Sequence, residues 1–120
     1  MQIKKPTIYA IQALREYQST QDILTTPDIA RRLDISIAYA TKVNRALVEG
    51  GFVEAIRGSM GGHRLAKDLR KIPIAELIGQ IDGGLLDEEP GETKDMLDIR
   101  RKLRDTLAER GWGKPVASLL

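Results

Sequence analysis

The sequence predicts a mainly α-helical chain that carries one small β-hairpin, and three observations support this fold class. Apolar residues recur every three or four positions in five separate segments, which is the spacing of helices with one buried face. Capping residues such as Ser36 and glycine pairs such as Gly50-Gly51 mark where helices begin and end. Between two of these helices, a short alternating segment and a glycine-rich turn predict the hairpin.

Length and composition limit the classes of protein to consider. The chain has 120 residues, 42% hydrophobic and 30% charged, enough for one core with an appended element. No stretch approaches the ~20 apolar residues of a membrane span, and the N-terminus lacks the apolar run of a secretory signal, so we expect a cytoplasmic location. Because the chain has no cysteine and one histidine, we expect no disulfide, no metal site and no cofactor.

Charge is divided unevenly along the chain. Residues 1 to 72 hold 12 Lys and Arg and 7 Asp and Glu, a net charge of +5, whereas residues 73 to 120 hold 7 and 10, a net charge of −3. A basic half favours a polyanionic partner. A difference of this size also arises by chance in a short chain, so the motifs must decide.

The first two helices are predicted by apolar spacing and by their starts. Pro6 suits the first turn of a helix whose apolar face continues to Tyr17, and Ile23 with Leu24 suggests a short strand after it. Thr26, as N-cap, and Pro27 then begin a short second helix. The apolar positions of the two helices are Ala10, Ile11, Ala13, Leu14 and Tyr17 in the first, and Ile29, Ala30 and Leu33 in the second.

The segment ISIAYATKVNRALVEG, residues 35 to 50, predicts a third helix with two contrasting faces. About three residues separate it from the second helix, which is the spacing of a helix-turn-helix. One face is apolar: Ala40, Val43 and Leu47. The other is small, hydroxylic and cationic: Ala38, Thr41, Lys42 and Arg45. Such a face can enter a DNA major groove and read base edges, although solvated helix faces also carry Lys and Arg.

A β-hairpin is predicted directly after this helix. Residues 52 to 57 alternate apolar and polar side chains, GSMGG follows, and residues 63 to 66 form the return strand. Arg57 and Arg64 flank the tip, where they would lie along a phosphate backbone or in the minor groove. A helix-turn-helix followed by such a hairpin predicts a winged helix. A phosphate-binding loop of an enzyme is disfavoured because the G-x-x-x-x-G-K-[ST] pattern is absent.

These residues resemble a known family. The I-S-x-x-Y pattern at Ile35 and the R-G-x-x-G-G pattern at Arg57 are similar to those of the Rrf-type regulators, the family of IscR, NsrR and CymR, and the similarity covers most of the chain. The resemblance implies a homodimeric, DNA-binding transcription factor, often a repressor. The positions that it matches to DNA contacts are Ser36, Ala38, Tyr39, Thr41 and Lys42 on the helix and Arg57, Ser59, Gly61 and Gly62 on the wing. To these we add Arg45, His63 and Arg64.

The chain departs from the family pattern at three places. Many members carry three cysteines between the helix after the wing and the last helix, where they ligate an iron–sulfur cluster. The corresponding segment here, GGLLDEEPGETKDML, has none, which removes that sensory mechanism. His63 replaces the aromatic residue after the wing glycines, and Lys5-Pro6-Thr7 replaces the usual Ser/Thr-Lys-Gly opening.

The segment after the wing predicts two more helices and an acidic loop. An apolar stripe from Ile74 to Ile81 predicts a helix, and residues 84 to 92 form the acidic loop, which we expect to be solvated because its spacing matches no calcium loop. A long helix begins near Thr93, with Met96, Ile99, Leu103 and Leu107 on one stripe. In the resembled family this is the dimerisation helix, so we expect this stripe and Trp112 at a dimer interface. The alternative is that the stripe packs on its own domain.

Together these features divide the chain into a winged helix-turn-helix domain (1 to 83), the acidic loop (84 to 92), and a dimerisation helix with a C-terminal tail (93 to 120). The lone His63 has no base-orienting partner, so we expect no catalytic residue and no enzyme. We predict a regulator that acts as a homodimer on a palindromic operator in double-stranded DNA; the alternative is a winged-helix module that binds another protein. The sequence leaves open the operator, the sign of regulation, and whether a small molecule or a partner protein is the effector.

Overall fold

The computed structural model describes residues 3–20, 22–81 and 93–120. The predicted acidic loop at residues 84–92 lies outside the described residues. Within them, the chain is mainly helical with one two-stranded antiparallel hairpin, which confirms the predicted fold class. None of the described helices has both the length and the apolar character needed to cross a lipid bilayer.

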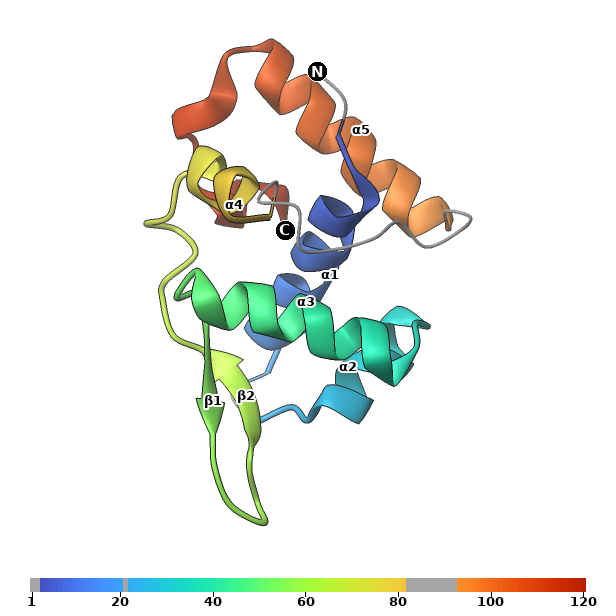
Figure 1. Cartoon of the computed structure of the whole chain (residues 1–120). Helices are drawn as coiled ribbons and strands as arrows, with labels where there is room; N and C mark the ends of the chain where they lie inside the picture. The colour runs from blue at the N-terminus through green and yellow to red at the C-terminus, as the bar shows by residue number, and fades with distance from the viewer. Residues whose placement is uncertain (1–2, 21, 82–92) are drawn as a thin grey trace.

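Helix α1 (Lys5–Gln18) is the centre of the structure (Figure 1). Pro6 lies in its first turn, as predicted, where a missing N–H costs nothing. Helix α1 is buried on most sides rather than on one stripe. The elements that contact it are α2 (Thr26–Leu33), α3 (Ile37–Glu49), β2 (Gly62–Leu65), α4 (Ile74–Ile81) and α5 (Lys94–Ala108). A single helix therefore connects the helix-turn-helix to the C-terminal part of the chain.

Helices α2 (Thr26–Leu33) and α3 (Ile37–Glu49) form the predicted helix-turn-helix. The N-cap of α2 is Thr25, not Thr26 as predicted, because the Thr25 hydroxyl accepts from the Asp28 N–H and the Asp28 carboxylate accepts from the Thr25 N–H. Because Thr25 and Thr26 are adjacent and threonine is a favoured N-cap residue, the sequence pattern did not distinguish the two positions. Asp34 takes a left-handed conformation, with φ of 55°, and turns the chain into α3.

The wing consists of β1 (Val53–Ile56) and β2 (Gly62–Leu65), and it projects from the helical body (Figure 1). The strands pair with Val53 opposite Leu65 and Ile56 opposite Gly62. In the middle of β2, His63 exchanges both backbone hydrogen bonds with Leu24, so the predicted strand before α2 is a single bridge. This bridge fixes the wing to the α1–α2 connection.

The C-terminal elements return to the helical body. Helices α4 (Ile74–Ile81) and α5 (Lys94–Ala108) are followed by two 3-10 turns, η1 (Gly111–Gly113) and η2 (Val116–Leu119). The Val116 N–H donates to the Ile72 carbonyl (2.7 Å) and the Ala117 N–H to the Leu69 carbonyl (2.9 Å). Buried side chains from Ile3 to Leu119 belong to one hydrophobic cluster.

Candidate nucleic-acid interface

The outward face of α3 carries the predicted groove-reading residues. Ser36 caps the helix as predicted, since its hydroxyl accepts from the Tyr39 N–H at 3.0 Å. The apolar residues predicted to face inward are buried: Ala40, Val43 and Leu47. The residues predicted to face outward are exposed: Ala38, Thr41, Lys42 and Arg45. The two faces of α3 are therefore oriented as the sequence indicated.

The polar groups on this face are available to a nucleic acid. The Thr41 hydroxyl donates to the Ile37 carbonyl at 2.8 Å, so Thr41 offers its methyl group and the acceptor lone pairs of its oxygen. Within the described residues, Lys42 has no ion-pair partner. Arg45 lies 3.9 Å from Glu49, an exposed pair that a phosphate can displace at little cost.

A chain of buried hydrogen bonds fixes the position of α3, and sequence analysis did not predict it. The Tyr17 hydroxyl donates to Asn44 Oδ1 at 2.7 Å, and Asn44 Nδ2 donates to Thr26 Oγ1 at 3.3 Å. Burial raises the pKa of the Tyr17 hydroxyl, which therefore remains a donor at neutral pH. These bonds join α1, α2 and α3 in one orientation, because breaking either leaves a buried polar group unpaired.

The wing tip is a tight turn over residues 58–61. The Gly61 N–H donates to the Gly58 carbonyl at 3.0 Å, and Gly58 has a φ of 111°, a conformation that favours glycine. Ser59 and Met60 lie at the tip and are exposed. Arg57 is also exposed, and no ion pair holds its guanidinium among the residues that the structure describes.

Three residues of the predicted interface make contacts within the chain. Tyr39 is buried, and its ring packs edge-on against Tyr9 at 5.1 Å, so it belongs to the core rather than to the exposed face. His63 is half-buried in the middle of β2, opposite Ala55, where burial lowers its pKa and keeps it neutral. Arg64 pairs with Glu54 on the opposite strand, which neutralises its charge locally.

Two wing glycines are required by packing inside the chain. A Cβ on Gly61 would lie 2.1 Å from the Ile56 carbonyl oxygen, and one on Gly62 would lie 2.7 Å from the Leu24 carbonyl oxygen. Their predicted role was close approach to DNA. The structure instead explains both through the turn and through the bridge to the α1–α2 connection.

The stripe predicted to form a dimer interface is largely used inside the chain. Met96, Ile99 and Leu103 are buried in the chain's own core, with α5 packed against α1, so for these residues the alternative is correct. The physical reason is that α1 provides apolar surface on the side facing α5 as well as on the side facing α3. Leu107 is partly buried and lines a shallow pocket of about 230 Å³ with Trp112, which remains 39% exposed.

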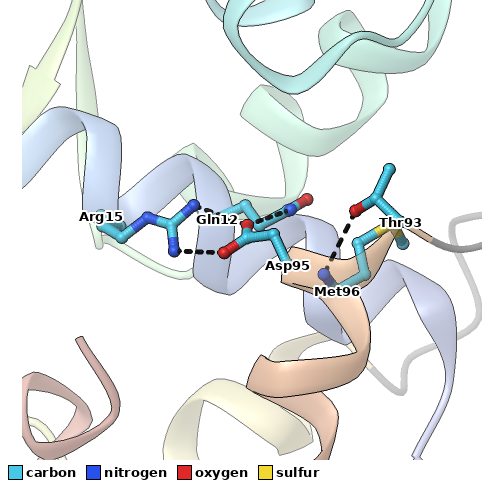
Figure 2. Close-up of polar contacts among 5 residues, drawn as sticks. All are labelled: Gln12, Arg15, Thr93, Asp95 and Met96. Carbon is cyan, nitrogen blue, oxygen red and sulfur yellow. Dashed lines mark hydrogen bonds and ion pairs between the residues drawn. The ribbon is translucent and has the colours of Figure 1, made fainter.

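Polar contacts also join α5 to α1 (Figure 2). Arg15 makes a bidentate pair with the Asp95 carboxylate, at 2.9 and 2.7 Å, and Gln12 donates to the same carboxylate at 2.7 Å. The hydrogen bonds from Arg15 lower the pKa of Asp95. The Thr93 hydroxyl caps α5 by accepting from the Met96 N–H, so the helix begins where the sequence predicted.

Sequence analysis singled out Trp112 as an interface residue but missed three other exposed apolar residues. Among the described residues, four large apolar side chains are exposed: Ile37, Met60, Leu97 and Trp112. Ile37 and Met60 lie at the start of α3 and at the wing tip, whereas Leu97 and Trp112 lie in the C-terminal part. The position of Met60 between two glycines of a predicted hairpin tip was the one available signal, because a tip residue has no core to enter.

Comparison with known proteins gives consistent matches. The family described as "Rrf2: Iron-dependent Transcriptional regulator" matches residues 3–109. The putative HTH-type transcriptional regulator BadM of Rhodopseudomonas palustris is 30% identical over 109 residues, which cover 88% of this chain and 70% of that protein. The HTH-type transcriptional regulator IscR of Escherichia coli K12 is 32% identical over 76 residues, covering 62% of this chain and 47% of that protein. The match thus spans about half the length of IscR.

Solved structures share the fold. A putative transcriptional regulator from Listeria innocua matches with a TM-score of 0.69 at 21% identity, over 99% of this chain and 85% of that one. CymR, the global cysteine regulator of B. subtilis, matches with a TM-score of 0.68 at 19% identity, over 99% and 95% of the two chains.

The iron in the family description finds no suitable ligands among the described residues. There is no cysteine in the sequence to hold an iron–sulfur cluster. In the part of the chain that the structure describes, no group of three or more His, Cys, Asp or Glu is arranged to hold a metal ion. Residues 3–20, 22–81 and 93–120 therefore do not fit the metal that the description implies.

Proposed function

The chain belongs to the Rrf2 family of transcriptional regulators, which are not enzymes, and from this premise we propose that it binds operator DNA sequence-specifically as a homodimeric repressor, without an iron–sulfur cluster. The observation that carries the proposal is the exposed face of α3, where Ala38, Thr41 and Lys42 lie together and Lys42 forms no ion pair with any described residue. Thr41 and Lys42 would read base edges in the major groove. Arg57 would contact the backbone or the minor groove beside the wing.

The proposed division of the chain follows from this arrangement. Residues 1–83 would bind DNA, and residues 93–120 would carry the dimer contact. Because Met96, Ile99 and Leu103 are buried in their own chain, we propose that the contact uses the apolar surface still exposed around Leu97 and Trp112. Helix α5 lies at the end of the molecule opposite the wing, so this contact would leave the DNA surface open (Figure 1). A two-fold axis would then demand a palindromic operator.

The experiment is selection from a random pool of double-stranded DNA, followed by titration of the selected site at several salt concentrations. Thr41→Ala should change base preference at one position of each half-site by ~1 to 3 kcal/mol. Arg57→Ala should weaken binding to every sequence and reduce the salt slope by about one phosphate contact. The matched control is Lys102→Ala, an exposed cation on α5, which should bind as wild type does.

Three results would contradict the proposal. A wild-type protein that enriches no duplex, or whose two interface variants bind every probe as wild type does, would refute the DNA surface. Selected sites without palindromic symmetry, together with a monomer by sedimentation at micromolar concentration, would refute the homodimer. Binding to a protein partner that persists at high salt while DNA is ignored would favour the alternative module.

A further inference from the structure

Met60 is the most exposed large apolar side chain in the described structure. Its side chain is 88% exposed, whereas Met96 in α5 is 3% exposed. Exposed single apolar residues are common on protein surfaces, so exposure alone carries no function. The position of Met60 at the end of a projecting hairpin is what calls for an explanation.

The tight turn over residues 58–61 holds Met60 at the exposed end of the hairpin. The turn is closed by the hydrogen bond between Gly58 and Gly61, and the Ile56 carbonyl blocks any side chain at Gly61. Gly58 has no atom within 4 Å of its Cβ position. Met60 therefore stands on a narrow tip with a bare glycine on either side of the Ser59-Met60 pair, and Arg57 precedes that tip.

A narrow tip with an apolar end and a nearby cation has the chemistry of a minor-groove wedge. The minor groove of B-DNA is about 6 Å wide, which admits a thin hairpin end better than a helix. Met is among the side chains that insert between base steps and partly unstack them, and its unbranched thioether adapts to an irregular gap. The guanidinium of Arg57 would be drawn to the negative potential of the same groove.

We propose that Met60 inserts into the minor groove beside each half-site and partly unstacks one base step there. Pyrimidine–purine steps, TA and CA/TG, deform most easily, so the protein would prefer them at a position that α3 does not touch. This inference rests on the proposed DNA binding by α3 and the wing. It adds a second source of specificity, the deformability of flanking DNA, to base reading by α3.

The test uses the intact protein and duplexes that carry the selected half-sites with either a TA step or a rigid A-tract in the flank. A 2-aminopurine at the flanking step reports unstacking as a rise in fluorescence. Wild type should raise the fluorescence and bind the TA duplex about tenfold more tightly than the A-tract duplex. Met60→Gln, of similar length but polar, should lose both effects, and Met60→Leu should retain them.

A control variant separates the wedge from general effects. Glu76→Gln changes an exposed side chain of α4 that belongs to neither proposed contact surface, and it should behave as wild type. If Met60→Gln keeps the fluorescence rise and the flank preference while wild type binds the operator, the wedge is refuted and the proposed function stands. If wild type binds no duplex, both proposals fail.

Discussion

Replacing Leu103 with Ala tests whether α5 belongs to the core of its own chain. Leu103 is 0% exposed and packs with Met96 and Ile99 in the cluster that surrounds α1. Truncating a fully buried leucine removes its transfer free energy and leaves a cavity, at a cost of ~2 to 5 kcal/mol. Lys102→Ala on the same helix is the control: Lys102 is exposed, so its truncation should change the free energy of unfolding by less than ~0.5 kcal/mol.

Urea denaturation followed by far-ultraviolet circular dichroism measures this difference. With a loss of ~3 kcal/mol and a denaturant slope of ~1.5 kcal/mol per molar urea, the midpoint for Leu103→Ala should fall by ~2 M. The fall should be the same at two protein concentrations that differ tenfold, because the lost contacts are within one chain.

The opposite outcome would refute the packing of α5 described above. A Leu103→Ala protein that keeps the wild-type midpoint but sediments as a monomer would show that the stripe faces a second chain. A midpoint that falls only at the lower protein concentration would lead to the same conclusion.

Three further predictions follow from individual contacts. Tyr17→Phe leaves the Asn44 amide oxygen unpaired and should cost ~1 to 3 kcal/mol of unfolding free energy at pH 7. Because the folded pKa of Tyr17 is raised, wild type should also lose stability above about pH 10 more steeply than the variant does. Equal slopes of unfolding free energy against pH in the two proteins would contradict this. Asp95→Asn should lower stability by ~0.2 to 1 kcal/mol, since the ion pair between Asp95 and Arg15 is half-exposed. Because the folded pKa of Asp95 is lowered, the thermal midpoints of wild type and variant should differ above about pH 4 and converge below it. A difference that does not change with pH would count against the ion pair. Gly62→Ala should lower the urea midpoint by an amount that corresponds to ~1 to 3 kcal/mol, because its Cβ would meet the backbone of the α1–α2 connection. The control is Gly79→Ala in α4, which has open space around it and should stabilise the chain. An unchanged midpoint for Gly62→Ala would argue against the bridge between the wing and the α1–α2 connection.

The sequence alone determined the elements that depend on neighbours a few positions away. Ser36 was identified as an N-cap and the last helix was expected to begin near Thr93; the structure confirms both, because a cap is a contact over three residues. The two faces of α3 followed from the same local spacing. Even the error at the start of α2 is a shift of one position, from Thr26 to Thr25.

Only the tertiary structure decided which surfaces meet. The spacing of Met96, Ile99 and Leu103 predicts an apolar stripe that must be covered. The hydrophobic effect favours burial against any apolar surface, so the sequence could not show whether α1 or a second chain covers the stripe. Tyr39 was assigned to DNA by resemblance and His63 by its place beside the wing. Tyr39 packs against Tyr9, and His63 is held by a backbone bridge to the α1–α2 connection. These contacts join residues far apart in the chain, and no local pattern encodes them.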